Sequence, residues 1–196
     1  MSTTCPSAAI LLTDGFEEAE ALIIVDVLRR LDVAVSTLAC QENLYVRSYH
    51  DVQVLADARL VDANEKLFDA VILPGGPQGA RSLGQNGKVT NFIRAHDKAG
   101  KLICPICSAG AHVLAANCLL HGRRYVCSGD NHLLYKDGTY IEQEIVRDGN
   151  IVSGRGLGLS FDFAFFIGAL LRSPEVAYEQ ARHIYTELRP FQQTAA

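Results

Sequence analysis

Short apolar runs alternate along this chain with segments in which apolar residues recur at helical spacing. The apolar runs predict buried strands at 8–12, 33–38, 70–73, 102–106 and 150–153, with a weaker one at 52–55. Helical spacing predicts helices at 17–31, 88–99, 159–171 and 174–185. This alternation is typical of an α/β domain. Because no repeat or linker interrupts it, we expect residues 1–196 to form a single domain.

The section from 122 to 147 departs from the alternation. An Asp-Gly pair at 137–138 lies between apolar runs at 133–135 and 140–141, which is typical of a hairpin turn. We therefore expect an excursion with antiparallel strands here. The polar tail after about residue 190 is expected to be disordered.

Composition and charge indicate which kinds of molecule the protein can be expected to bind. The chain is 48% hydrophobic, its formal net charge is −4, and it has no run of Lys or Arg, so we expect neither nucleic acid nor an anionic membrane as a partner. The start, MSTTCPSAAILL, lacks the basic region of a signal peptide, and Thr13 and Asp14 interrupt its apolar run. We expect a cytoplasmic protein that acts on a small molecule or on another protein.

The chain has six cysteines, at positions 5, 40, 104, 107, 118 and 127. Their spacing is irregular and nothing indicates export, so we expect free thiols in a reducing compartment. Zinc would need a second ligand pair, and the sequence has no other C-x-x-C and no H-x-x-x-H, so no metal is expected. A dithiol formed by Cys104 and Cys107 remains an alternative, because C-P-x-C after a strand is similar to the thioredoxin motif.

Cys107 follows the strand predicted at 102–106 and precedes four small residues, Ser-Ala-Gly-Ala. Small side chains permit a sharp turn from strand to helix that exposes the thiol, as in a nucleophile elbow. The dipole and free amides of a helix start lower the pKa of a thiol and can hold an oxyanion. We expect Cys107 to be the nucleophile. The alternative is a small buried hydrophobic residue, and Cys104, inside the strand, is at best a resolving thiol.

Three acidic residues lie at the start of the helix predicted at 17–31, and helical geometry separates them. A turn of ~3.6 residues places Glu20 within roughly 40° of the apolar Ile24 and Val27, whereas Glu18 falls on the opposite, solvated side and Glu17 lies between. An apolar setting raises the pKa of a carboxyl, which can then exchange a proton near neutral pH. Glu20 is therefore the expected acid–base group.

Two glycine-rich loops follow predicted strands, at 74–79 and 154–158. Neither has the spacing of a P-loop or a dinucleotide-binding motif, so no nucleotide cofactor is expected. The first is an ordinary turn in one interpretation. In the other, bare backbone at Gly75 and Gly76 approaches the thiol and offers an amide. Because sites in open parallel sheets form at the carboxyl ends of strands, segments 14–20, 74–79 and 107–112 are expected on one rim.

Four segments carry a resemblance to a known family, in its order and spacing: LLTDGFEEAEALIIVDVLRR, FDAVILPGGPQGARSL, KLICPICSAGAHVLAA and IVSGRGLGLSFDFAFFIGALL. From about residue 8 to 171 the chain resembles the ThiJ/PfpI superfamily, in the branch of the parkinsonism-associated protein deglycase and its bacterial relatives. The resemblance implies a flavodoxin-like three-layer sandwich with a mainly parallel central sheet, and a homodimer. It implies Cys107 as the elbow cysteine, Glu20 as its partner, and backbone amides of Gly76 and Ser108 as oxyanion donors.

The sequence departs from the family pattern at two places. Many members carry a histidine about twenty residues after the cysteine, where this chain has Cys127 and Ser128; a histidine from 121 or 132 would need a shift. The residue three before the nucleophile is commonly alanine and is Cys104 here, which leaves a disulfide open. His112, on the following helix, is expected to be a packing residue rather than a base.

We therefore expect a cofactor-independent thiol enzyme of the glyoxalase or deglycase type. Its substrates would be 2-oxoaldehydes such as methylglyoxal, free or as early adducts on glycated protein, and its products 2-hydroxy acids. The alternative from another class is an oxidative-stress sensor or redox-regulated chaperone that uses Cys107, with Cys104 as a candidate redox partner. Peptide hydrolysis is a third alternative, weakened by the missing histidine.

Overall fold

A mixed sheet forms the centre of the protein, which we describe from a computed structural model over residues 5–63 and 66–188. Its seven strands have the order β10-β11-β7-β6-β1-β2-β5, and all neighbours are parallel except β10 and β11. The strands are β1 (Ser7–Leu12), β2 (Ala34–Ala39), β5 (Ala58–Arg59), β6 (Ala70–Leu73), β7 (Leu102–Pro105), β10 (Ile145–Asp148) and β11 (Ile151–Gly154).

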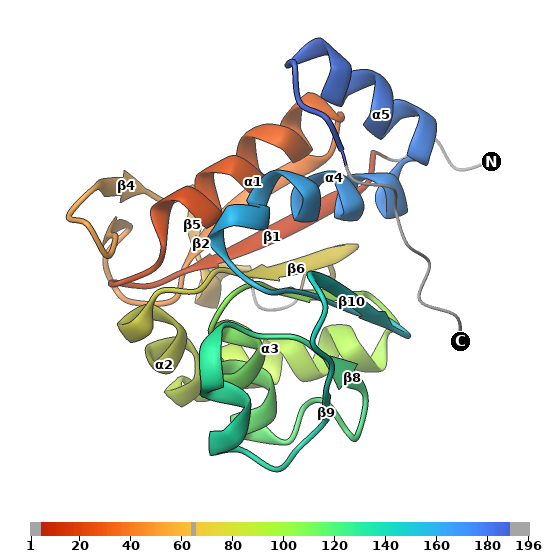
Figure 1. Ribbon diagram of the computed structural model, residues 1–196. Helices are drawn as coiled ribbons and strands as arrows, with labels where there is room; N and C mark the ends of the chain where they lie inside the picture. The colour runs from red at the N-terminus through yellow and green to blue at the C-terminus, as the bar shows by residue number, and fades with distance from the viewer. Residues whose placement is uncertain (1–4, 64–65, 189–196) are drawn as a thin grey trace.

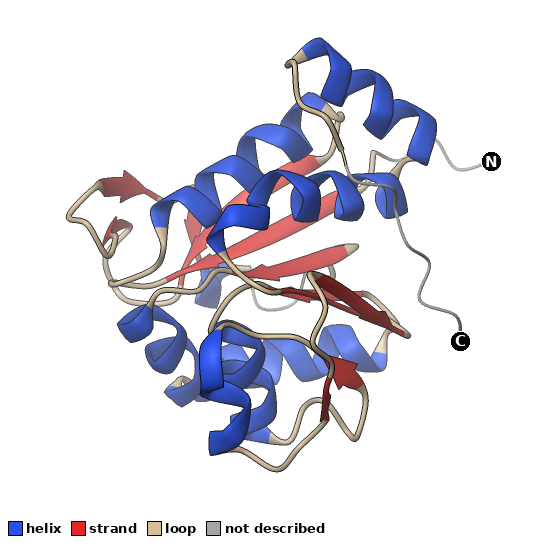
Figure 2. Ribbon diagram, in the orientation of Figure 1, coloured by secondary structure: helices blue, strands red, loops and turns tan. Residues whose placement is uncertain are grey.

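Helices cover both faces of this sheet (Figures 1 and 2). On one side lie α1 (Glu18–Arg30), α4 (Ser160–Leu171) and α5 (Pro174–His183). On the other lie α2 (Pro77–Gln85), α3 (Gly87–Lys98) and the π-helix η2 (Gly110–Leu114). The expected three-layer α/β sandwich with a mainly parallel sheet is confirmed.

Strand β1 shows why the strands read as continuous apolar runs. Successive side chains of a strand point to opposite faces. Ala8, Ile10 and Leu12 join the core beneath α1 and α4, while Ala9 and Leu11 join the core beneath α2 and α3, and all are fully buried. A central strand covered on both faces has no solvent side to carry polar residues.

The remaining elements are short and lie in the loops. They are the antiparallel pair β3 (Tyr45–Arg47) and β4 (Gln53–Leu55), the parallel pair β8 (Arg124–Tyr125) and β9 (Thr139–Tyr140), and the 3-10 turns η1 (Leu60–Asp62), η3 (Ala115–Asn117), η4 (Gly129–Leu134) and η5 (Leu157–Leu159). The weak strand expected at 52–55 is thus real, but it belongs to a separate hairpin. Among the described residues, no helix is long and apolar enough to cross a membrane.

The prediction of a hairpin around residues 137–138 is wrong. Leu133 and Leu134 belong to a 3-10 turn, and β9 pairs in parallel with β8 instead of folding back on the preceding run. The cause is Asp137, whose carboxylate accepts hydrogen bonds from the backbone N–H of Leu120 at 2.7 Å and of His121 at 3.3 Å. The Asp-Gly pair therefore joins its own loop to the backbone at residues 120–121 and does not form the turn of a hairpin. The tail beyond 190 lies outside the described residues.

Candidate active site

Cys107 lies where β7 ends, at the carboxyl edge of the sheet. Its N–H donates to the carbonyl of Gly154 at 2.9 Å, which fixes it between β7 and β11. Its φ of 59° falls in the left-handed region, which is uncommon for a residue other than glycine and carries strain that the surroundings must hold. The expected sharp turn is confirmed, and the helix that follows is a π-helix, a feature often found at functional sites.

Glu20 points inward from the first turn of α1 and is fully buried, as predicted. Its Oε2 accepts a hydrogen bond from the N–H of Gly75 at 2.7 Å. Its Oε1 is buried with no fixed hydrogen-bond partner among the described residues. The prediction that Glu18 is solvated is wrong, because its side chain is only 16% exposed and its Oε1 lies 2.8 Å from His50 Nδ1.

Gly75 brings bare backbone against the thiol, as the second interpretation of this loop predicts, whereas Gly76 lies against the backbone of residues 15–17. A Cβ at Gly75 would lie 2.7 Å from the Cβ of Cys107 and 2.8 Å from Oε2 of Glu20, so only glycine fits between these two side chains. At Gly76 φ is 95°, and a Cβ would collide with the carbonyl oxygen of Gly15. The loop is more than a turn, because it also starts α2 with Pro77 in the first turn, a helix that the sequence pattern did not predict.

Of the two residues expected to supply oxyanion donors, Ser108 directly follows Cys107, and Gly76 is in contact with Ser108. The N–H of Ser108 hydrogen-bonds to the sulfur of Cys107, and the Ser108 hydroxyl donates to the carbonyl of Gly76 at 3.4 Å. Gly76 caps the N-terminus of α2, where backbone N–H groups lack helical partners. The arrangement suits a developing negative charge beside the sulfur, and binding of an oxyanion there stays a prediction.

The electrostatics of the pair differ from the sequence-based expectation. Burial raises the pKa of Glu20 to about 7, and hydrogen bonds from Gly75 and Cys107 offset this only in part. Burial and the nearby Glu20 carboxylate raise the pKa of the Cys107 thiol to about 11, although the helix start was expected to lower it. Because the two groups repel as anions, the thiol stays protonated while Glu20 carries the charge. A thiolate at Cys107 therefore requires a group that takes the proton, and Glu20 as that group stays a prediction.

Cys127 and Ser128 lie in the region where the resemblance led us to expect a histidine, and Ser128 interacts with the thiol. Its hydroxyl hydrogen-bonds to the Cys107 sulfur and lowers the pKa of that thiol. Asn131 Nδ2 holds Ser128 by donating to its carbonyl at 2.8 Å and to its hydroxyl at 3.4 Å. Asn131 also hydrogen-bonds to the ring of His112. A polar chain therefore leads from the thiol to His112, and sequence reasoning assigned no role to Ser128 or Asn131.

The other histidines considered from the sequence lie elsewhere. His112 is buried, with Nδ1 at 3.0 Å from the hydroxyl of Tyr135, as expected of a packing residue. His132 stacks on the ring of Tyr140 with centroids 3.8 Å apart, and His121 is exposed. The group that interacts with the sulfur from this region is therefore the hydroxyl of Ser128, which cannot act as a base near neutral pH.

Cys104 lies inside β7 and is fully buried in the core beneath α1 and α4. Burial raises the pKa of its thiol, which makes it a poor attacking group. All six cysteines are free, as predicted. A redox role for Cys104 stays a prediction.

One group of side chains could hold a metal ion. Ligand atoms of Glu17, Glu18 and His50 lie within 4.8 Å of one another. Glu18 and His50 already pair with each other, and burial raises the pKa of Glu17, which disfavours its charged form. Nothing further in this partly exposed cluster points to a metal.

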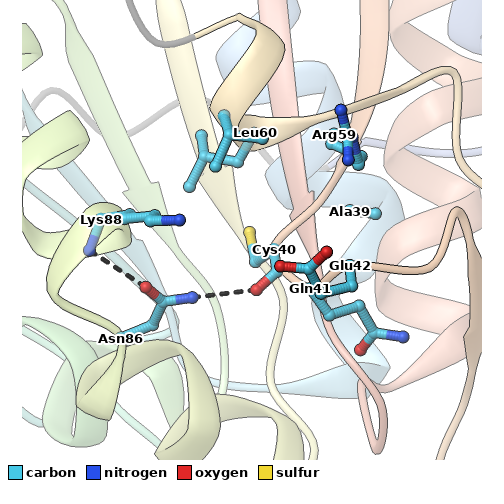
Figure 3. A pocket seen from close by; sticks show the side chains of 9 residues that line it. Ala39, Cys40, Gln41, Glu42, Arg59, Leu60, Asn86 and Lys88 are labelled. Carbon is cyan, nitrogen blue, oxygen red and sulfur yellow. Dashed lines mark hydrogen bonds between the residues drawn. The ribbon is translucent and has the colours of Figure 1, made fainter.

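A cavity of about 180 Å³ opens beside the carboxyl ends of β2 and β5 (Figure 3). Asn86 bridges its walls, because its side chain accepts from the N–H of Lys88 and donates to the carbonyl of Cys40. Burial raises the pKa of the Cys40 thiol to about 12. Arg59 here is held by two hydrogen bonds to Asp62. These groups are occupied with one another, and the cavity is separate from Cys107.

Comparison with known proteins places this site in context. The DJ-1/PfpI family model matches residues 6–169. Protein dj-1beta of Drosophila melanogaster is 33% identical over 178 residues, covering 90% of this chain and 95% of the relative. Glutathione-independent glyoxalase DJR-1.2 of Caenorhabditis elegans is 31% identical over 176 residues, covering 86% of this chain and 90% of the relative. The crystal structure of a mutant of the DJ-1 superfamily protein STM1931 from Salmonella typhimurium is 52% identical, with a TM-score of 0.91, and the match covers 93% of this chain and 99% of that one.

Proposed function

Because this chain belongs to the DJ-1/PfpI family, which includes a relative named as a glutathione-independent glyoxalase, we propose that it is a cysteine enzyme acting on 2-oxoaldehydes. The substrate is methylglyoxal or a similar aldehyde, free or as an early adduct on protein, and the product is a 2-hydroxy acid. The observation that carries the proposal is the buried Glu20 carboxyl, with a pKa of about 7, across Gly75 from the Cys107 thiol.

The first step forms a bond between sulfur and the aldehyde carbon. Glu20 takes the thiol proton as Cys107 attacks, and the carbonyl electron pair moves onto oxygen. Amides of Gly76 and Ser108 stabilise that oxyanion until it accepts the proton back from Glu20, giving a hemithioacetal. The Ser128 hydroxyl keeps the sulfur in place throughout.

The second step moves hydrogen between adjacent carbons. The Glu20 carboxylate removes the proton from the carbon bound to sulfur, and the electron pair moves through the carbon–carbon bond onto the neighbouring carbonyl oxygen, which gives an enediolate. Glu20 then returns that proton to the neighbouring carbon, while the hydroxyl proton of the hemithioacetal passes to the neighbouring oxygen. The result is a thioester of the 2-hydroxy acid. A carboxyl with a pKa near 7 suits both halves of this transfer, since neither of its protonation states is strongly favoured near neutral pH.

Hydrolysis completes the cycle. Water adds to the thioester, the carbon–sulfur bond breaks, and the sulfur leaves with a proton, so that methylglyoxal and one water give one lactate and one proton. Atoms and electrons balance without glutathione or any other co-reactant. We further propose that the enzyme is a cytoplasmic homodimer.

The test is lactate formation from methylglyoxal without glutathione, by wild type, Cys107→Ser, Glu20→Gln and Cys104→Ser. We expect turnover to be lost in the first two variants and kept in the third. Full turnover in Cys107→Ser would refute the proposal. No turnover in fully reduced wild type would also refute it, and graded peroxide with mass spectrometry of Cys107 would then test the sensor alternative.

A further inference from the structure

A second cavity, of about 370 Å³, lies between α2, η2 and the residue that follows η4. Its volume falls in the range of small-molecule sites. It is lined by Arg81, Gly84, Gln85, His112, Ala116, Asn117 and Tyr135. No acidic residue is among them, whereas the cavity in Figure 3 contains Glu42 and an arginine already paired with Asp62. The lining alone therefore favours an anionic ligand here.

Arg81 is the cation of this cavity and has no ionic partner. It is exposed, and among the described residues no carboxylate lies within ion-pair distance of it. Many other arginines of the described residues do pair with an Asp or Glu, among them Arg29, Arg30, Arg47, Arg59, Arg123, Arg124 and Arg155. All the donors of the Arg81 guanidinium are consequently available to a ligand.

Gln85 provides a second free donor on the same face. Arg81 and Gln85 are four residues apart on α2, so their side chains are neighbours on the helix surface. The Gln85 side chain is exposed and its amide has no hydrogen bond to another described residue. Asn117, by contrast, already donates its amide hydrogens to the carbonyls of Gly84 and Val113.

The inner wall is neutral and largely aromatic. Burial and then the charge of Arg81 lower the pKa of His112, so its ring is uncharged at neutral pH. The ring meets Tyr135 edge-on, with centroids 5.8 Å apart and planes at 90°, and Ala116 adds an apolar surface. A ligand here would meet hydrogen-bond donors at one end of the cavity, and the Tyr135 ring and the Ala116 side chain at the other.

We propose that Arg81 and Gln85 bind the oxyanion group of a small organic acid or phosphate ester whose body packs against Tyr135 and Ala116. Guanidinium groups match both carboxylate and phosphate, so both sources share this chemistry. The site is distinct from the thiol but connected to it, because His112 begins the polar chain through Asn131 that ends at Cys107.

The experiment follows the ring signals of His112 by NMR while benzoate, phenyl phosphate or inorganic phosphate is added at constant ionic strength. We expect saturable shifts with benzoate or phenyl phosphate, and the tighter of these two identifies the preferred acid group. Inorganic phosphate should bind more weakly than phenyl phosphate, because it lacks the body that packs against Tyr135 and Ala116. Arg81→Gln should weaken binding about tenfold or more, as loss of a charge-assisted hydrogen bond does. Arg182→Gln, which removes the same charge from exposed α5, should leave it unchanged.

A steric variant tests where the body of the ligand lies. Ala116 is exposed, so Ala116→Leu should fold normally while filling the cavity, and it should block benzoate and phenyl phosphate with Arg81 intact. The proposal is overturned if no probe gives a saturable shift, if Arg81→Gln and Arg182→Gln weaken binding equally, or if Ala116→Leu has no effect.

Discussion

Replacing Glu20 by glutamine should stabilise the protein while it removes the proposed acid–base group. Glutamine has nearly the same shape, and its side-chain oxygen can still accept the hydrogen bond that Gly75 donates at 2.7 Å. It cannot carry a charge. The variant therefore isolates the free energy of holding a carboxylate in this buried position.

The size of the change in the free energy of unfolding follows from the pKa of Glu20. Glu20 has an ordinary value of 4.5 in the unfolded chain and about 7 in the folded protein. Between these values the folded state binds more protons, so the free energy of unfolding falls as pH rises through this window. At about 1.4 kcal/mol per pKa unit, ionisation of Glu20 lowers that free energy by about 3 kcal/mol above pH 7.

The assay is urea unfolding of wild type and Glu20→Gln at about pH 5 and pH 8. We expect the variant to be more stable by about 3 kcal/mol at the higher pH, a gain of roughly 6–12 °C in Tm, with a much smaller difference at the lower pH. Glu179→Gln, on exposed α5, is the matched control and should change little. If the variant is equally stable or less stable than wild type at the higher pH, the ionised Glu20 carboxylate does not destabilise the fold.

Further predictions concern the groups around the sulfur. Gly75→Ala should destabilise the fold by about 1–3 kcal/mol in urea unfolding and abolish lactate formation, because its Cβ overlaps both Cys107 and Glu20; unchanged kinetics would contradict the packing described. Ser128→Ala should slow iodoacetamide alkylation of Cys107 at fixed pH by roughly fivefold, through loss of one hydrogen bond; an unchanged alkylation rate counts against that role. Cys104→Ala should lower Tm through a small core cavity without changing lactate formation; if turnover falls with it, Cys104 takes part in the chemistry. Light scattering should give the mass of a dimer, and a monomer at all concentrations would refute the homodimer.

The sequence predicted five of the seven strands of the sheet, all except β5 and β10, and the inward turn of Glu20, because these depend on local periodicity. The buried strands appear as apolar runs, and the helical spacing of Glu20 with Ile24 and Val27 places it on the buried face. The elbow at Cys107 was also predictable, since four small residues after a strand permit a sharp turn into a helix. These features need only neighbours along the chain.

The features that the sequence did not reveal depend on contacts between distant segments. Asp137 looked like part of a hairpin turn, and its role in capping the loop at residue 120 is visible only in three dimensions. The raised pKa of Cys107 comes from burial and from Glu20, which is close only because β1 and β7 end at the same edge. Glu18 is covered by His50, which comes from a loop. The spacing of apolar residues along the chain does not predict where that loop lies.

The pH dependence of kcat/KM for methylglyoxal tests the Cys107–Glu20 pair most directly. We expect kcat/KM to rise with pH through one ionisation near pH 7, that of Glu20. This ionisation should be missing from the pH profile of any residual activity of Glu20→Gln. A rate that rises only in the range of a free thiol, or a profile that Glu20→Gln leaves unchanged, would contradict the claim that Glu20 is the base.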